Sequence, residues 1–252
     1  MKAALFEKPH VLNVVTKTLR PLVSGETLVR VQSCGVCGTD VHIVEGTSRS
    51  TPPVVLGHEY AGVVEDVYGG DARWKPGQRV AVDPNISCGA CFYCRKGLVH
   101  LCVSLRALGV DIDGGMAEFC IVPVGQLHEI PESLSVEQSA FIEPVSCALH
   151  GIKQARIEEG STVVIVGGGT IGLMMLQLAK HAGAARTILV EPLRHKQEIA
   201  RQLAADHVLL PEEAAAAIRD LTIFGADVVI ECVGRPETAT AAIGYARRGG
   251  TV

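Results

Sequence analysis

The chain has 252 residues, 48% of them hydrophobic and 20% charged, which excludes a disordered protein and predicts a large core divided over two domains. Its net charge of −4 argues against a nucleic-acid partner, because such partners usually leave a basic patch on the protein. No secretory signal is expected, since only four apolar residues, 3–6, stand together before Glu7. The nine cysteines are therefore expected to be reduced thiols in a cytoplasmic protein.

Residues 1–150 have an irregular pattern of short β-rich runs, which is typical of a β domain. Short β-rich runs at 28–31, 61–64 and 79–82 alternate with turns rich in glycine and proline. This pattern predicts a compact antiparallel β domain whose loops carry the chemistry.

Residues of metal-binding type gather at two places early in this domain. Cys37 is followed by Asp40 and His42, and His58 is followed by Glu59. A thiolate, an imidazole and a carboxylate together form the ligand set of a catalytic zinc ion, which keeps one coordination position open. Each residue alone is a weak signal, because a lone histidine or cysteine is more often structural.

Residues 85–105 contain four cysteines in the spacing C-x2-C-x2-C-x7-C: Cys88, Cys91, Cys94 and Cys102. Two-residue gaps let a tight turn direct neighbouring sulfurs to one point, which predicts a closed structural zinc site. Disulfides are the alternative, and the lack of a secretory signal disfavours them. The remaining cysteines have no partner at metal-binding spacing and are predicted to be buried free thiols: Cys34, Cys120, Cys147 and Cys232.

Residues 151–252 alternate between predicted strands and helices, which indicates an α/β domain with a parallel, doubly wound sheet. Strands are expected at 163–166, 187–190, 208–210 and 226–232, and helices at 171–181, at 194–205 and from Pro211 and Pro236. The uncharged stretch 160–179 is long enough for a membrane span, but its three consecutive glycines predict a strand, a turn and a helix. A fifth strand is expected to begin at Gly249, which would leave the sheet incomplete.

Residues 167–172 have the sequence G-G-G-T-I-G, which contains the pattern G-x-G-x-x-G. The pattern alone is weak, but here it follows an apolar strand and opens a helix, and Glu191 stands nineteen residues after Gly172. Gly167 permits the tight turn, Gly169 lets the backbone approach a pyrophosphate, and Gly172 lets the helix lie close to the sheet. Glu191 can accept hydrogen bonds from ribose hydroxyls and would repel a 2′-phosphate, which predicts NAD over NADP.

Five motifs occur in order: 35–42, 57–59, the four cysteines, Phe141-Ile-Glu-Pro144 and the glycine pattern. Together they resemble the zinc-dependent medium-chain alcohol dehydrogenase family, and most closely its polyol (sorbitol), butanediol and threonine dehydrogenase branch. The resemblance covers essentially the whole chain. It implies a GroES-like catalytic zinc domain over 1–150 and an NAD-binding Rossmann domain, truncated, over 151–252.

The resemblance also implies roles for individual residues. A catalytic zinc would be bound by Cys37, His58 and Glu59, with water or Glu143 nearby. The resemblance leaves open whether Glu59 or Glu143 is the direct ligand or whether the two exchange. A proton relay would use Thr39 and His42. Asp40 would orient a zinc ligand without binding the metal itself. Further residues match positions that contact NAD: Ile171, Glu191 and Lys196.

Two functions are carried forward. The first is an oxidoreductase that uses zinc and NAD to transfer a hydride from a secondary alcohol or polyol, with one catalytic and one structural zinc ion. The second is a truncated, catalytically inactive relative that still binds zinc and nucleotide. Homo-oligomers, either dimers or tetramers, are common among the relatives, and neither a membrane nor a nucleic acid is expected as a partner.

Overall fold

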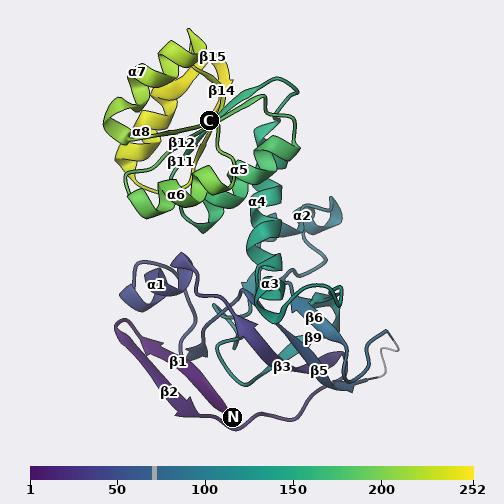
Figure 1. The fold of residues 1–252 in the computed structure, drawn as a ribbon. Coiled ribbons are helices and arrows are strands. Elements are labelled where there is room, and N and C mark those ends of the chain that lie inside the picture. Colours follow the sequence, from purple (N-terminus) through teal and green to yellow (C-terminus); the bar gives the residue numbers. More distant parts are fainter. Residues whose placement is uncertain (70–72) are drawn as a thin grey trace. The chain divides into compact units, whose positions relative to one another are not determined.

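The computed structural model describes residues 1–69 and 73–252 (Figure 1). The chain divides into two compact units, Met1–Glu143 and Pro144–Val252. The boundary expected at residue 150 falls inside helix α4 (Ile142–Ala155), which begins at the end of the first unit.

The first unit is built on a five-stranded antiparallel sheet in the order β10-β6-β5-β3-β9, as the sequence predicts. The β-rich runs recognised in the sequence lie in its three central strands. The strands of this sheet are β3 (Glu26–Cys34), β5 (Tyr60–Tyr68), β6 (Arg79–Val82), β9 (Phe119–Pro123) and β10 (Leu127–Glu129). Alternate residues of these strands form the core of the unit, which includes Val29, Val64, Val80 and Val122.

Smaller elements complete the first unit and carry its loops. A three-stranded sheet has the order β2-β1-β4, and β7 pairs with β8. These strands are β1 (Lys2–Lys8), β2 (Val11–Thr16), β4 (Val54–Val55), β7 (Asn85–Ile86) and β8 (Arg106–Ala107). The short helices are α1 (Gly38–Glu45), α2 (Phe92–Arg95), α3 (Val136–Ala140), η1 (Val99–Leu101) and η2 (Val124–Gln126).

The second unit contains a five-stranded parallel sheet in the order β13-β12-β11-β14-β15, which confirms the doubly wound α/β architecture. Its strands are β11 (Thr162–Val166), β12 (Arg186–Val190), β13 (His207–Leu209), β14 (Ala226–Glu231) and β15 (Ala246–Thr251). After α4, the helices are α5 (Thr170–His181), α6 (Arg194–Gln202), α7 (Pro211–Thr222) and α8 (Pro236–Tyr245).

Helices cover both faces of this sheet, which explains why β11 is apolar from Val163 to Val166 (Figure 1). Val163 and Ile165 pack on one face with residues of α4, α5 and α6. Val164 and Val166 pack on the other face with residues of α7 and α8. A strand buried on both faces has no position for a polar side chain.

Several predicted boundaries in the second unit are wrong by a few residues. Helix α6 ends at Gln202 rather than at 205, because Ala204 has a φ of 62°, in the left-handed region, and turns the chain toward β13. Strand β15 begins at Ala246, three residues before the predicted start.

The free cysteines are less uniformly buried than predicted. Cys120 is buried, but Cys34 and Cys232 are half-buried and Cys147 is exposed. Cys147 lies on α4, where the buried stripe consists of Pro144, Ala148, Ile152 and Ala155. The helical period places Cys147 beside that stripe and not in it.

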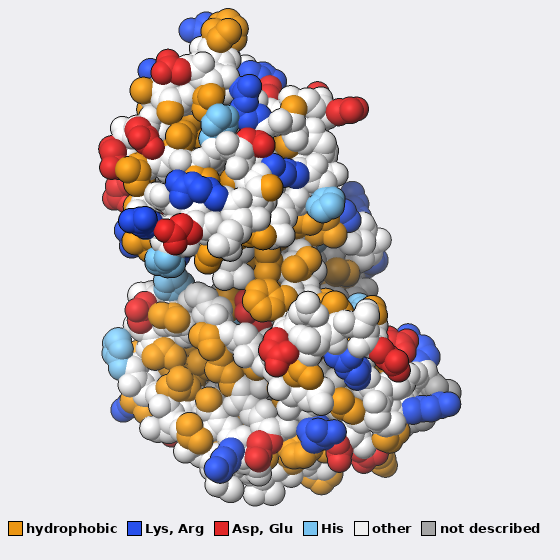
Figure 2. Space-filling view, viewed as in Figure 1, with side chains coloured by type: hydrophobic (Ala, Val, Ile, Leu, Met, Phe, Trp, Pro, Cys, Tyr) orange, Lys and Arg blue, Asp and Glu red, His pale blue; other side chains and the backbone are white. Residues whose placement is uncertain are grey.

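The uncharged stretch 160–179 forms β11, a turn and most of α5, as predicted. Among the helices of the described residues, none is both long and apolar enough to cross a bilayer. On the face drawn in Figure 2, Lys and Arg side chains are interspersed with Asp and Glu side chains.

Candidate metal and nucleotide sites

Three of the predicted zinc ligands converge in the first unit. Cys37 immediately precedes α1, and His58 and Glu59 lie in the segment that joins β4 to β5. One ligand atom from each of the three residues lies within 4.8 Å of the others. The start of α1 carries the positive end of the helix dipole, which favours a negatively charged group at Cys37.

Asp40 connects the two segments that supply these ligands. Its side chain is buried, and its Oδ2 accepts a hydrogen bond of 2.8 Å from the backbone N–H of Cys37. Its Oδ1 lies 3.5 Å from Nδ1 of His58, and neither of these buried atoms has a closer partner among the described residues. Because a carboxylate can only accept, a hydrogen bond across this contact would require a ring N–H on Nδ1 and would leave Nε2 for a metal.

The groups around His58 favour a positive charge at this side chain. Burial alone would lower the pKa of His58, but the neighbouring Asp40 and Cys37 outweigh burial and raise this pKa to about 10. The side chains of Asp40 and Cys37 thus favour a positive charge at this position. A divalent cation bound by Cys37, His58 and Glu59 would supply that charge.

The carboxylate of Glu59 depends on Gly35, the first residue of the motif 35–42, to which the sequence analysis assigned no role of its own. The backbone N–H of Gly35 donates to the carbonyl of Glu59 over 2.7 Å. A Cβ placed on Gly35 would lie 2.4 Å from Oε2 of Glu59, so any larger residue would displace this carboxylate. The only signal in the sequence is the position of Gly35, two residues before Cys37.

The other residues assigned to catalysis lie around this group. Thr39 is on α1, with its Oγ1 3.6 Å from Sγ of Cys37. His42 is three residues further along the same helix and is exposed, with Nδ1 3.5 Å from Oγ1 of Thr47. Glu143 is in the first turn of α4 and is not one of the three residues whose ligand atoms lie within 4.8 Å.

The four cysteines of residues 85–105 form a second convergent group, here called the four-cysteine lobe. Their Sγ atoms all lie within 4.8 Å of one another. Sγ of Cys94 is 3.5 Å from that of Cys91 and 3.9 Å from that of Cys88. Four thiolates at ~2.3 Å from a tetrahedral zinc ion would be separated by ~3.8 Å, so the sulfurs are spaced for this metal.

Backbone donors surround the sulfurs of the lobe. The N–H of Cys88 and that of Ser104 both donate to Sγ of Cys102. The backbone N–H groups of Cys94 and Val103 lower the pKa of Cys91 to about 6, which favours the thiolate form that a metal requires. The lobe therefore contains a complete ligand set, with no open position for a substrate.

The glycine pattern forms the turn between β11 and α5. Gly167 has a φ of 101°. A Cβ on Gly172 would lie 1.9 Å from the carbonyl oxygen of Gly167, so the helix can approach the strand only when this residue is glycine. No atom lies within 4 Å of the position that a Cβ on Gly169 would take, so the backbone there is open to a ligand at the start of α5.

Glu191 follows β12 and holds the glycine turn. Its Oε2 accepts a hydrogen bond of 2.7 Å from the N–H of Gly168, and its Oε1 accepts one of 2.8 Å from the N–H of Leu193. Gln197, which the sequence analysis did not identify, is buried and donates from Nε2 to the carbonyl oxygen of Glu191 over 2.6 Å. These contacts fix the carboxylate beside the backbone that would face a dinucleotide.

The last two residues predicted to contact the cofactor have different surroundings. Ile171 is half-buried and packs against the core between the sheet and α5. Lys196 is half-buried in the first turn of α6. Their contact with a cofactor stays a prediction.

The comparisons with known proteins agree with this arrangement. Residues 23–132 match the family model of the alcohol dehydrogenase GroES-like domain, and residues 170–252 match that of the zinc-binding dehydrogenases. D-arabinitol dehydrogenase 1 of Uromyces fabae is 35% identical over 258 residues, which cover 100% of this chain and 74% of that protein. The chain belongs to the family of zinc-binding alcohol dehydrogenases.

Two further members of this family illustrate its range. The L-threonine 3-dehydrogenase of Pyrococcus horikoshii is 36% identical over 84% of this chain and 63% of its own length. A zinc-binding dehydrogenase from Sinorhizobium meliloti, solved with bound NADP, is 42% identical, with a TM-score of 0.95 over 100% of this chain and 75% of its own. The chain thus spans between 63% and 75% of the length of these three relatives.

Family membership confirms the resemblance and the fold class that the sequence predicts, with a GroES-like β domain and a Rossmann-type sheet. It also confirms zinc and a nicotinamide dinucleotide as the cofactors of this family.

Proposed function

We propose that this chain transfers a hydride between a secondary alcohol or polyol and NAD. The observation that carries the proposal is the convergence of Cys37, His58 and Glu59 within 4.8 Å, with Asp40 against two of them. Three protein ligands of this type are characteristic of a catalytic zinc site with one open position. The four-cysteine lobe is proposed to hold a second zinc ion with a purely structural role.

The residues of the chain are proposed to orient the substrate and remove its proton. When bound, zinc supplies a Lewis acid that favours loss of the hydroxyl proton of an alcohol. Thr39, beside Cys37, is placed to accept that proton, and the exposed His42 on the same helix is placed to pass it to solvent. Glu143 is proposed to exchange with Glu59 as a ligand.

The proposed cofactor is NAD, held by Gly167, Gly169, Gly172 and Glu191, with contacts from Ile171 and Lys196. The buried Glu191 carboxylate supports this choice, because it can accept hydrogen bonds from two ribose hydroxyls and repels a 2′-phosphate. The Sinorhizobium meliloti protein was solved with bound NADP, so the preference for NAD is tested separately. A higher kcat/KM with NADP than with NAD would contradict it.

The substrate class is taken from the polyol and amino-alcohol dehydrogenases among the relatives. A cytoplasmic location is proposed from the reduced state of all nine cysteines. Assembly into dimers or tetramers is proposed from the resemblance alone.

A steady-state assay separates this function from the inactive alternative. Purified, zinc-loaded protein is mixed with NAD⁺ and with sorbitol, 2,3-butanediol or threonine, and formation of NADH is followed at its absorbance band. We expect turnover with at least one substrate and its loss after treatment with a zinc chelator. Zinc and NAD binding without turnover of any secondary alcohol would support the inactive alternative.

A further inference from the structure

The segment 109–116, here called the brace, lies directly against the zinc-ligand segment. It follows the four-cysteine lobe and β8 along the chain. The N–H of Gly114 donates to the carbonyl of Val55 and the N–H of Gly115 donates to that of Gly57, each over 2.8 Å. The brace is therefore bonded, backbone to backbone, to the residues immediately before His58.

Glycines make this close approach of two backbones possible. A Cβ on Gly114 would lie 2.1 Å from the carbonyl oxygen of Gly57, and one on Gly109 would lie 2.4 Å from the same atom. Gly57 has a φ of 92°, and a Cβ there would meet the backbone nitrogen of Met116 at 2.8 Å. These clashes involve backbone atoms, which cannot rotate away as side-chain ends can, so a larger residue would push the two segments apart.

Two aspartates, Asp111 and Asp113, form hydrogen bonds that hold the middle of the brace. Oδ2 of Asp111 accepts hydrogen bonds from the N–H of Ala107 in β8 and from the guanidinium of Arg49. Oδ1 of Asp113 accepts a hydrogen bond of 3.0 Å from the N–H of Val55. The side chain of Asp111 is only 5% exposed, whereas that of Asp113 is 39% exposed and also pairs with Lys17.

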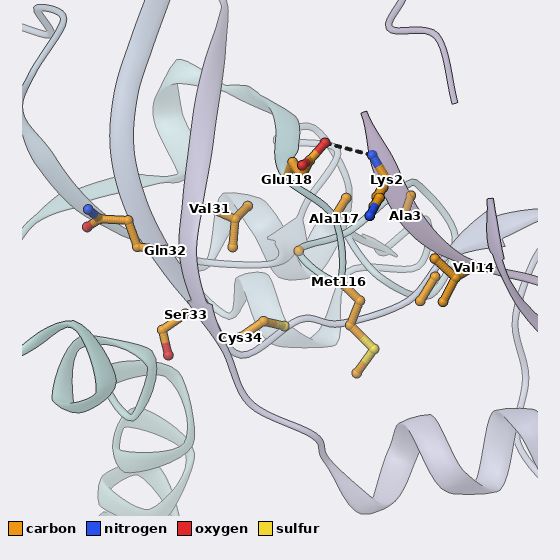
Figure 3. Close-up of a pocket in the computed structure, with 12 residues that line it drawn as sticks. Lys2, Ala3, Val14, Val31, Gln32, Ser33, Cys34, Met116, Ala117 and Glu118 are labelled. Atoms are coloured by element: carbon orange, nitrogen blue, oxygen red, sulfur yellow. Dashed lines mark hydrogen bonds between the residues drawn. The ribbon is translucent and has the colours of Figure 1, made fainter. Parts of the chain in front are cut away.

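Side chains of the brace add to this hold, since Val110 and Met116 pack against the core cluster that includes Val54 and Leu56. The side chain of Met116 lies with Cys34 along a cavity of about 430 Å³ (Figure 3). Lys2 and Glu118 are hydrogen-bonded on the opposite wall. The position of the brace therefore rests on its backbone bonds, its aspartates and the packing of Val110 and Met116.

We propose that the brace is a positioning element for the catalytic zinc, and that Asp111 and Gly114 are its key positioning residues. The metal site is assembled from two separate segments, one carrying Cys37 and the other carrying His58 and Glu59. The metal stays bound only while these segments remain together. The brace holds the second segment in place and ties it, through Ala107, to the exit of the four-cysteine lobe.

The test measures release of zinc rather than turnover. The wild-type protein with both zinc sites filled is mixed with a chromophoric chelator, and the two release phases are assigned with Cys37→Ser, which lacks the catalytic phase. In Gly114→Ala and in Asp111→Asn, we expect the catalytic zinc to leave about tenfold faster, the usual scale for groups that support metal ligands. The release rate from the four-cysteine lobe is expected to stay at the wild-type value.

Gly125→Ala is the matched control, because a Cβ at that position in the same unit meets no described atom within 4 Å apart from its two chain neighbours. It should release both zinc ions at the wild-type rates. If Gly114→Ala does not fold, Asp111→Asn, which keeps the size of the side chain, decides the question. Wild-type release of the catalytic zinc from the folded variants would overturn the proposal, and so would equal acceleration of both phases, since that indicates general loosening.

The inference rests on the proposed catalytic metal site, and the two can fail separately. If the wild-type protein binds no zinc at Cys37, both the proposed function and the inference are wrong. If it binds that zinc and Asp111→Asn releases it at the wild-type rate, only the inference is wrong.

Discussion

The four-cysteine lobe and the site at Cys37 bring metal-binding residues together in opposite ways. The lobe draws all four ligands from Cys88 to Cys102, on a loop with two short helices. The Cys37 site draws its three ligands from two segments on either side of β4, and it needs Asp40, Gly35 and the brace to hold them. A closed ligand set can fold its own loop, whereas an open site must be preformed by the rest of the domain.

This contrast predicts that the two sites fail differently. Loss of a ligand in the lobe should reduce stability, because its metal is part of the fold. Loss of a ligand in the open site should reduce turnover but not stability, because the surrounding sheet already holds the shape of this site. The following substitutions test whether the two metal sites respond differently, in order of decreasing expected effect.

Cys37→Ser should abolish turnover and leave the fold intact. Zinc acting as a Lewis acid contributes on the order of 4 kcal/mol to transition-state stabilisation, so kcat/KM should fall by ~10³-fold or more. Turnover is measured together with the circular dichroism spectrum and the thermal midpoint. Wild-type activity in this variant would show that the catalytic assignment is wrong.

Cys94→Ser should instead lower stability. Sγ of Cys94 lies within 3.9 Å of two other sulfurs, so its loss breaks the ligand set of the structural zinc. We expect the thermal midpoint of unfolding to fall by ~10 °C. Calorimetry with and without added zinc checks this expectation, and an unchanged midpoint would mean that the lobe adds nothing to the fold.

Asp40→Asn should weaken the open site alone. The amide keeps the size of the side chain but removes the charge beside His58, so affinity for the catalytic zinc should fall about tenfold. Competition with a chelator gives this affinity, and the affinity of the lobe serves as the internal reference. Equal weakening of both sites would refute a specific role for Asp40.

Lys96→Ala should have the smallest effect. The ammonium of Lys96 lies 4.6 Å from the centre of the Phe92 ring on the exposed surface of the lobe. Exposed contacts of this kind contribute little, so the midpoint should move by ~2 °C or less, while both zinc ions remain bound. A loss of lobe zinc in this variant would show that the fold of the lobe depends on its surface as well as on its metal.

The same contrast explains how much of the molecule the sequence could predict. The lobe and the glycine turn are local, so the spacing of Cys88–Cys102 and the pattern Gly167–Gly172 were enough to identify them. The strand–helix alternation of the second unit was also predicted, since a strand buried on both faces must be apolar. The family resemblance predicted that Cys37 and His58 bind the same zinc ion, because their spacing in the sequence is only weak evidence for a shared site.

The features that the sequence did not predict depend on contacts between distant segments. Gly35 against Glu59, Gln197 against Glu191 and the brace against Gly57 all follow from how the chain folds back on itself. Cys147 was predicted to be buried because of its residue type, but the face of its helix decides its exposure. A left-handed Ala204 ended α6 early for a similar reason, since its conformation is set by the path to β13.

Crystal diffraction data collected on both sides of the zinc absorption edge test the central claim most directly. We expect two anomalous peaks per chain, one among the four sulfurs of the lobe and one at ~2.0–2.3 Å from Sγ of Cys37 and from a ring nitrogen of His58. A peak in the lobe with none between Cys37 and His58, in crystals grown with excess zinc, would contradict the account.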